Sequence, residues 1–151
     1  MTEEFDPEGS LFQELMNAAY AKWQENEKEW RSFTAFIHNL SGDERTAVLI
    51  GKLNQQVTNG GFAQWCDNDY AEPLRELKAS LDLVGTKKSK QAWDLACRAR
   101  GIYNVQQMHY DDGYECDFMN DKLDALDEEF YLLNDALLFD CEAFFQANAV
   151  S

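Results

Sequence analysis

The stretch DDGYECDFMNDKLDALDEEFYLLNDALLFDCE, residues 111–142, is the segment from which the fold of this chain is best inferred. It holds twelve carboxylates and a single base, Lys122. The chain has a formal net charge of −15, of which −11 belongs to these thirty-two residues and −4 to all the others. The acidity is therefore concentrated in one segment.

This segment has the periodicity of an amphipathic helix. Apolar residues recur at alternating steps of three and four, which is the spacing of a helix face that packs against a core. They are Met119, Leu123, Leu126, Phe130, Leu133, Leu137, Cys141 and Phe144. Carboxylates repeat with the same step on the other side, at Asp117, Asp121, Asp124, Glu128, Asp135 and Glu142. The pattern predicts a C-terminal helix, or a helix pair broken near Asn134, that ends at about Asn148.

An acidic helix face has two interpretations. Glu and Lys four residues apart stabilise a helix by about 0.2–0.5 kcal/mol, and like charges at that spacing cost a similar amount, so a solvated surface helix normally mixes signs. The face can be solvated and serve only solubility, or it can bind a basic partner. The near absence of bases favours binding, since solubility alone does not require it. A saline habitat would spread the acids evenly, whereas the first 110 residues are nearly balanced.

The composition fits one soluble domain. The chain has 151 residues, of which 45% are hydrophobic, and its ten Phe, six Tyr and four Trp are enough for one sizeable core. No internal repeat or linker divides it. We therefore expect residues 1–151 to form a single compact multi-helix domain.

Helical periodicity recurs along the chain, and no segment alternates as a strand would. Residues 11–40 fit one long helix or two helices with a bend. Further helices are expected over residues 44–57, 74–84 and 87–101. Residues 102–116 lack helical period and are predicted to form an ordered loop. The predicted fold class is all-α, with an acidic C-terminal helical segment.

A tight corner is expected after the helix at residues 44–57. Asn59-Gly60-Gly61-Phe62 places two adjacent glycines, which adopt backbone angles closed to other residues, before an aromatic side chain. Phe62 and Trp65 are available to anchor this corner. A phosphate site is not expected, because no lysine and no Gly-x-Gly-x-x-Gly accompanies the glycine pair.

Motifs of catalysis and of cofactor binding are missing. There is no nucleophile elbow, zinc-binding helix motif or phosphate loop, and the calcium-loop pattern fails around Gly113. Cys66, Cys97, Cys116 and Cys141 lie far apart without a Cys-x-x-Cys pair, as reduced structural cysteines do. We expect no enzyme activity, no cofactor and no metal site.

The sequence also argues against a membrane or a nucleic acid as the partner. The first ten residues lack the features of a signal peptide, and no apolar run approaches the roughly 18 residues of a spanning helix, so a cytoplasmic protein is expected. Direct nucleic-acid binding is not expected, because Lys87, Lys88 and Lys90 are too few for such a surface in a chain with a pI of about 4.3. These lysines begin a predicted helix, where the helix dipole disfavours cations, so they are either tethered to carboxylates or free for another role.

The glycine corner carries a resemblance to a known family. The run Leu53-Asn54-Gln55-Gln56-Val57-Thr58-Asn59-Gly60-Gly61-Phe62-Ala63-Gln64-Trp65, then Leu81 to Gly85 and the helix at 92–99, resembles the signature of the bacterial DNA-mimic protein family of the nineteen-kilodalton type. Residues 123–131 are similar to the family more loosely. The resemblance implies an α-helical fold, an acidic surface and competition with DNA for a helix-turn-helix regulator, and it leaves a homodimer open. It assigns Asn59, Gly60, Gly61, Phe62 and Gln64 to a structural motif of the fold.

DNA mimicry is the first hypothesis for the acidic face, whose residues are assigned from the spacing and not from the resemblance. B-DNA carries one charge per about 3.4 Å along each strand, and carboxylates three or four residues apart on a helix lie about 4.5–6 Å apart along its axis. A transcriptional regulator, nucleoid protein or defence protein that grips phosphates would be drawn to such a surface and lose access to DNA. The candidate partner-binding residues are Asp111, Asp112, Glu115, Asp117, Asp121, Asp124, Asp127, Glu128, Glu129 and Asp135.

An alternative keeps the acidic face and changes the target. An immunity or anti-defence protein would cover the basic site of one nuclease or toxin, with shape-specific contacts to that single partner. The sequence does not separate this alternative from DNA mimicry.

Overall fold

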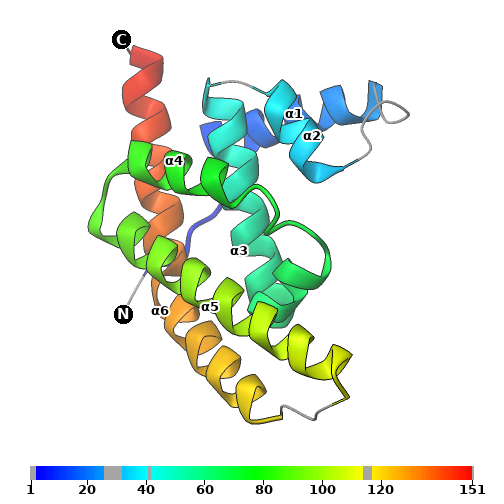
Figure 1. Ribbon diagram of the computed structural model, residues 1–151. Coiled ribbons are helices and arrows are strands. Elements are labelled where there is room, and N and C mark those ends of the chain that lie inside the picture. Colours follow the sequence, from blue (N-terminus) through cyan, green and yellow to red (C-terminus); the bar gives the residue numbers. More distant parts are fainter. Residues whose placement is uncertain (1–2, 26–31, 41, 114–116, 151) are drawn as a thin grey trace.

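The computed structural model describes residues 3–25, 32–40, 42–113 and 117–150, and within these ranges the chain forms six helices and no strand (Figure 1). The all-α prediction is confirmed. The helices are α1 (Leu11–Glu25), α2 (Phe33–Asn39), α3 (Gly42–Asp67), α4 (Leu74–Val84), α5 (Lys87–Asp111) and α6 (Asp117–Val150).

Helix α3 is the central element, and it packs against α1, α4, α5 and α6 (Figure 1). Helices α5 and α6 form an antiparallel hairpin beside it. Near one end of this hairpin, Thr86 Oγ1 donates a hydrogen bond to Asp140 Oδ2 over 2.6 Å. Near the other end, Gln106 Nε2 donates to Asn120 Oδ1 over the same distance. This pairing places the first half of α6 beside the last turns of α5, in yellow in Figure 1.

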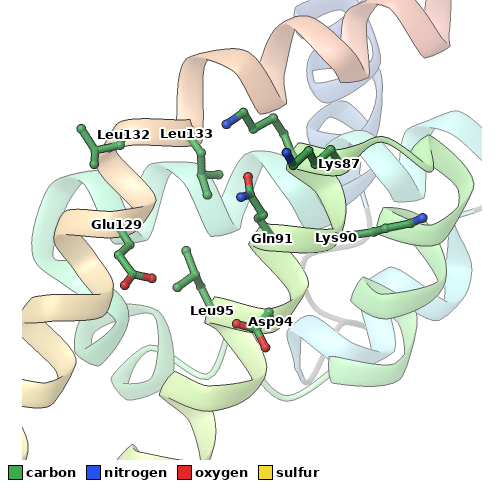
Figure 2. Close-up of a pocket in the computed structure, with 9 residues that line it drawn as sticks. Lys87, Lys90, Gln91, Asp94, Leu95, Glu129, Leu132 and Leu133 are labelled. Carbon is green, nitrogen blue, oxygen red and sulfur yellow. The ribbon is translucent and has the colours of Figure 1, made fainter.

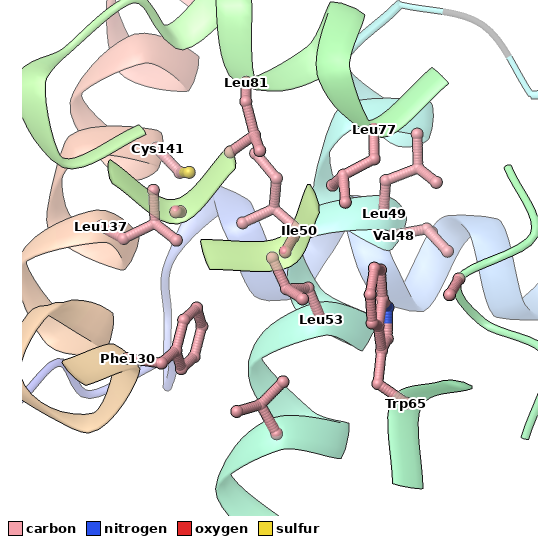
Figure 3. Packing of buried hydrophobic residues seen from close by; sticks show 14 of the residues in the cluster. Val48, Leu49, Ile50, Leu53, Trp65, Leu77, Leu81, Phe130, Leu137 and Cys141 are labelled. Atoms are coloured by element: carbon pink, nitrogen blue, oxygen red, sulfur yellow. The ribbon is translucent and has the colours of Figure 1, made fainter. Parts of the chain in front are cut away.

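The core is built from the apolar faces of the helices, and its largest buried side chains are aromatic. Phe62 lies at its centre, with ring centroids 6.0 Å from Trp65 and 5.6 Å from Phe130, both in edge-to-face geometry. Figure 3 shows Trp65 and Phe130 on either side of Leu53 from α3. Offset and edge-to-face aromatic pairs add stability beyond the area that they bury.

The predicted apolar face of α6 packs into this core. The buried residues of this face are Leu123, Leu126, Phe130, Leu133, Leu137 and Cys141. Met119 and Phe144, at its two ends, are only half-buried. The helix is continuous from Asp117 to Val150, so of the two predicted forms the single helix is correct.

The glycine pair forms the predicted corner inside α3. Gly60 has φ −151° and Gly61 has φ +80° with ψ 176°, so the backbone leaves helical geometry at these two residues and resumes it at Phe62. A side chain at Gly61 would be strained by its positive φ, and its Cβ would collide with the Asp127 carboxylate of α6. The corner therefore requires glycine for both its backbone angles and its approach to α6.

The structure decides between the two predictions for residues 11–40 and corrects a third. Residues 11–40 contain two separate helices, α1 and α2, so the two-helix prediction is the correct one. The loop predicted at 102–116 is wrong, because α5 continues through Gly101 to Asp111, and residues 114–116 lie outside the described part. The inward face of α5 continues beyond Ala99 with a polar residue, Gln106, which is buried and bonded to Asn120. A prediction from the spacing of apolar residues does not recognise a buried position that is occupied by a polar residue.

Candidate functional site

Three carboxylates form an exposed acidic row on the first half of α6. Asp121, Asp124 and Glu128 are all exposed, and they follow one another at steps of three and four. The opposite side of the helix buries Leu123 and Leu126. Within the described residues, none of the three carboxylates forms an ion pair or a side-chain hydrogen bond. The acidic row therefore presents its charge to solvent.

The acidic row affects the ionisation of its neighbours. Burial is the main reason that the pKa of Tyr131 is raised, and the charges of Asp127, Glu128 and Asp124 raise it further. Burial also raises the pKa of Asp127; the hydrogen bond from Phe62 opposes this, whereas Asp124 and Glu128 add to it. In both residues the contribution of the neighbouring carboxylates to the pKa shift, which is smaller than that of burial, has the sign expected for a negative potential along this part of α6.

Asp127 lies beside the acidic row but is turned toward the glycine corner. Its Oδ1 accepts a hydrogen bond of 2.8 Å from the Phe62 amide, and Oδ2 lies where a side chain at Gly61 would be. Phe62 begins the helical segment after the corner, so its N–H has no helical acceptor. The Asp127 carboxylate therefore connects α6 to the glycine corner.

Amide side chains form further hydrogen bonds around the corner. Asn59 Nδ2 donates to Gln64 Oε1 over 3.2 Å, and Gln64 Nε2 donates to Gln56 Oε1 over 2.9 Å. A Cβ at Gly60 would collide with the Gln64 side chain. These contacts connect Asn59, Gly60 and Gln64 within the corner, and the assignment of Asn59, Gly60, Gly61, Phe62 and Gln64 to a structural motif stays a prediction.

Two carboxylates on the second half of α6, Asp135 and Glu142, stabilise the N-terminal part of the chain. Asp135 Oδ1 accepts from the Phe5 amide over 3.1 Å. Glu142 accepts from the amides of Leu11 and Phe12 over 3.1 and 2.9 Å, at the start of α1. Burial opposes ionisation of Glu142, but hydrogen bonds from Gln146 and from these two amides outweigh it and lower the pKa of this carboxyl. A negative charge at a helix N-terminus is stabilising.

A groove lies between α5 and α6, beyond the acidic row. It encloses about 570 Å³ and is lined by Lys87, Lys88, Lys90, Gln91, Asp94, Leu95, Glu129, Leu132 and Leu133. Figure 2 shows Gln91 and Leu95 of α5 facing Glu129 and Leu133 of α6. The three lysine side chains form no ion pair with described residues, so of the two predicted possibilities the structure favours untethered lysines. Leu132 is 81% exposed at the rim.

No group of three or more His, Cys, Asp or Glu side chains among the described residues could hold a metal ion. Of the three described cysteines, Cys97 is exposed and the other two are buried. Burial raises the pKa of Cys66 to about 11 and that of Cys141 to about 12, so both thiols are protonated at neutral pH. None of the described helices is long and apolar enough to cross a membrane.

A family model described as DMP19-like protein matches residues 38–148. The chain belongs to the DMP19-like protein family. The match covers the four helices of this DMP19-like protein from α3 onward almost to its C-terminal end, including the glycine corner and the acidic row. Family membership suggests a DNA mimic and a protein that is not an enzyme. Comparisons with curated proteins and with solved structures gave no match.

The remaining candidate residues of this DMP19-like protein differ in whether the structure describes their side chains. Asp111 and Asp112 are exposed at the end of α5, and Glu129 is exposed in the groove. Glu115 and the side chain of Asp117 lie outside the described part. Partner binding by any of the candidates stays a prediction.

Sequence reasoning missed the hydrogen bonds of Asp127, Asp135 and Glu142, because each partner lies 65 to 131 residues away in the chain. No local pattern marks them. A hint exists for Asp127 alone, since a glycine pair requires a neighbour to satisfy the amides beyond it.

Proposed function

We propose that this DMP19-like protein is a DNA mimic that binds the DNA-binding surface of a partner protein and blocks its access to DNA. The observation that supports the proposal is the exposed acidic row of Asp121, Asp124 and Glu128, which has no basic partner among the described residues. A surface built only for solubility gains from mixed charges. An unneutralised row is suited to a basic partner.

The spacing of the acidic row is compatible with a strand of phosphates. Asp121 and Asp124 are separated by about 4.5 Å along the helix axis, and Asp124 and Glu128 by about 6 Å. Phosphates along a DNA strand are about 3.4 Å apart along the helix axis. Asp111 and Asp112 add charge at the adjacent end of α5. Lys and Arg side chains placed to meet phosphates would find carboxylates at comparable intervals, and a charge-assisted hydrogen bond to either is among the stronger ones.

The partner class follows from this chemistry. A DNA-binding protein such as a helix-turn-helix regulator, or a nucleoid or defence protein, carries a basic surface that the acidic row would attract over long range. Nucleic acid itself would be repelled by a net charge of −15. Val105 and Met108 are exposed on α5 near the hairpin end, and they offer apolar contacts beside the charges.

The acidic row is short, and this bears on the oligomeric state. From Asp121 to Glu128 it spans about 10.5 Å along α6, whereas one turn of DNA measures about 34–36 Å. A homodimer that aligned two rows would approach the length of a DNA site. Sedimentation at several protein concentrations, with and without the partner, measures whether such a dimer forms.

The decisive experiment combines partner capture with a charge variant. The full chain is immobilised, incubated with host lysate, and eluted with increasing salt or with duplex DNA. We expect DNA-binding proteins in the eluates. The triple variant Asp121→Asn, Asp124→Asn, Glu128→Gln should lose them while staying folded, because like-charge repulsion is relieved.

A matched control removes three charges elsewhere. Glu14→Gln, Asp69→Asn and Asp82→Asn change exposed acids on α1, on the turn after α3 and on α4, and this variant should bind as the original chain does. Equal loss in both triple variants would show that only net charge matters and would refute a role for the acidic row. One salt-resistant partner without DNA-binding activity would favour the immunity alternative instead.

A further inference from the structure

A separate cavity lies among α1, α2 and α3, and none of its lining residues belongs to α5 or α6. It encloses about 200 Å³ and is lined by Tyr20, Trp23, Phe33, Phe36, Lys52 and Tyr70. It adjoins a second hollow of about 430 Å³, which shares Trp23, Phe33 and Tyr70. Five of the six described lining side chains are aromatic, so this cavity can hold a flat apolar group on several sides.

The sixth lining residue places a cation among these rings. Lys52 Nζ lies 5.2 Å from the ring centroid of Tyr20 and 4.9 Å from that of Tyr70. It donates one hydrogen bond, of 3.0 Å, to Gln55 Oε1. An ammonium group has three protons to donate. Burial lowers the pKa of Lys52, as expected for a charge that is drawn out of water and has no carboxylate partner in the described part of the chain.

A second donor in the lining has no acceptor among the residues that the structure describes. The hydroxyl of Tyr20 is buried, and no described residue forms a hydrogen bond with it. Burial is the main reason that the pKa of this hydroxyl is raised, and the nearby Tyr70 adds to the effect. Buried polar groups without partners are uncommon in folded proteins, and each calls for an explanation such as a missing ligand.

We propose that this cavity binds a small aromatic monocarboxylate, whose ring packs among the aromatic side chains and whose carboxylate accepts hydrogen bonds from Lys52 Nζ and Tyr20 Oη. A carboxylate supplies the two acceptors and the negative charge that these groups lack. The Lys52 charge disfavours an organic cation in the same place. The volume is that of about one ring system, so a larger ligand would have to extend into the adjoining hollow.

The adjoining hollow sets a further limit on the ligand. Its lining includes Asp69 and Glu72, and both are exposed acids. Glu72 pairs with Arg100 over 3.1 Å, so a second carboxylate at the far end of the ligand would be repelled mainly by Asp69. The cavity is therefore expected to prefer a monocarboxylate to a dicarboxylate with the same ring.

The test is a titration of the full ¹⁵N-labelled chain, followed by amide chemical shifts. The probes are benzoate and indole-3-acetate, and the matched controls are benzyl alcohol, benzylammonium and terephthalate. We expect saturable shifts near Tyr20, Lys52 and Tyr70 with both acids, and none confined to the acidic row. Benzyl alcohol and benzylammonium lack the carboxylate and should each bind at least about ten-fold more weakly than benzoate, since charge-assisted hydrogen bonds are worth a factor of this order. Terephthalate should also bind more weakly than benzoate, because its second carboxylate is repelled in the adjoining hollow.

Two variants test the proposed donors. Lys52→Met keeps an apolar side chain of similar length and should weaken benzoate binding by about ten-fold or more. Tyr20→Phe removes the hydroxyl alone and should weaken it several-fold. Lys78→Met, on the exposed face of α4, is the control and should bind normally. Circular dichroism verifies that each variant is folded, and the comparison among probes decides the question even if one variant is not.

Several results would overturn the proposal. They are the absence of saturable shifts with both acids, equal binding by Lys52→Met, binding of benzylammonium as tight as that of benzoate, and shifts that appear in the groove around Lys87 instead. None of these outcomes bears on the acidic row, so the cavity and the DNA-mimic function are tested independently.

Discussion

Replacing Asp127 by alanine tests whether the glycine corner depends on a carboxylate from α6. Asp127 Oδ1 accepts a hydrogen bond of 2.8 Å from the Phe62 amide, at the point where α3 resumes after Gly61. The Asp127→Ala variant leaves this half-buried N–H without its acceptor. The same change stabilises the folded chain slightly, because it removes the repulsion between Asp127 and Asp124 of the acidic row.

The expected loss can be worked out from these two effects. A hydrogen bond to a charged group contributes about 1.5–3 kcal/mol, and relief of one like-charge pair returns about 0.2–0.5 kcal/mol. The net loss in the free energy of unfolding is therefore about 1–2.8 kcal/mol. In a chain of this size, that lowers Tm by about 2–11 °C. Asp127→Asn keeps an oxygen acceptor and removes a charge that burial disfavours, so it should change stability by less than about 1 kcal/mol.

The assay is urea denaturation followed by circular dichroism, with Asp124→Ala as the matched control. Asp124 is exposed and has no side-chain hydrogen bond among the described residues, so its replacement should cost less than about 0.5 kcal/mol. If Asp127→Ala proved no more harmful than Asp124→Ala, the corner would not depend on this carboxylate. If Asp127→Asn were as harmful as Asp127→Ala, the charge and not the acceptor would be the important feature.

Three further predictions concern stability alone. Glu142→Gln should lower the free energy of unfolding by about 1 kcal/mol at pH 7. Because the pKa of Glu142 in the folded chain lies below its ordinary 4.5, the difference between the two chains should shrink as the pH falls from 4.5 through the folded pKa. Urea titrations at pH 7 and pH 3 measure this difference. Phe62→Ala should cost about 3–5 kcal/mol through lost core packing, whereas the exposed Leu83→Ala serves as control in the same titration; a fully stable Phe62→Ala variant would contradict the anchoring role. Tyr20→Phe should stabilise the unliganded chain by about 1 kcal/mol, because it removes a buried hydroxyl without a partner; a lower Tm would show that the hydroxyl is satisfied.

Local patterns were sufficient to predict the main elements of the fold. The three-and-four spacing of apolar residues identified the buried side of α6, because a helix turns through the same angle at every residue. The glycine pair identified the corner, because the angles of Gly61 are closed to residues with a side chain. Both signals act over a few residues and need no knowledge of the rest of the chain.

The end of α5 could not be predicted in this way. Its inward position at residue 106 is a glutamine, whose burial is compensated by hydrogen bonds to Tyr110 and to Asn120 of α6. Sequence periodicity counts apolar residues, and it therefore loses a helix where the buried face becomes polar. The helix continues because α6 lies against it.

In the candidate site, too, the sequence predicted some features and the tertiary structure determined the others. The sequence by itself determined that the acids are concentrated in residues 111–142 and that a helix would present several of them on one side. Only the tertiary structure decided which of them form no hydrogen bond or ion pair with the described residues. Asp121, Asp124 and Glu128 face solvent, whereas Asp127 and Glu142 accept hydrogen bonds from backbone amides of α3 and α1. A carboxylate's charge is a property of its own side chain, but its role depends on which distant amide the folded chain brings within about 3 Å of it.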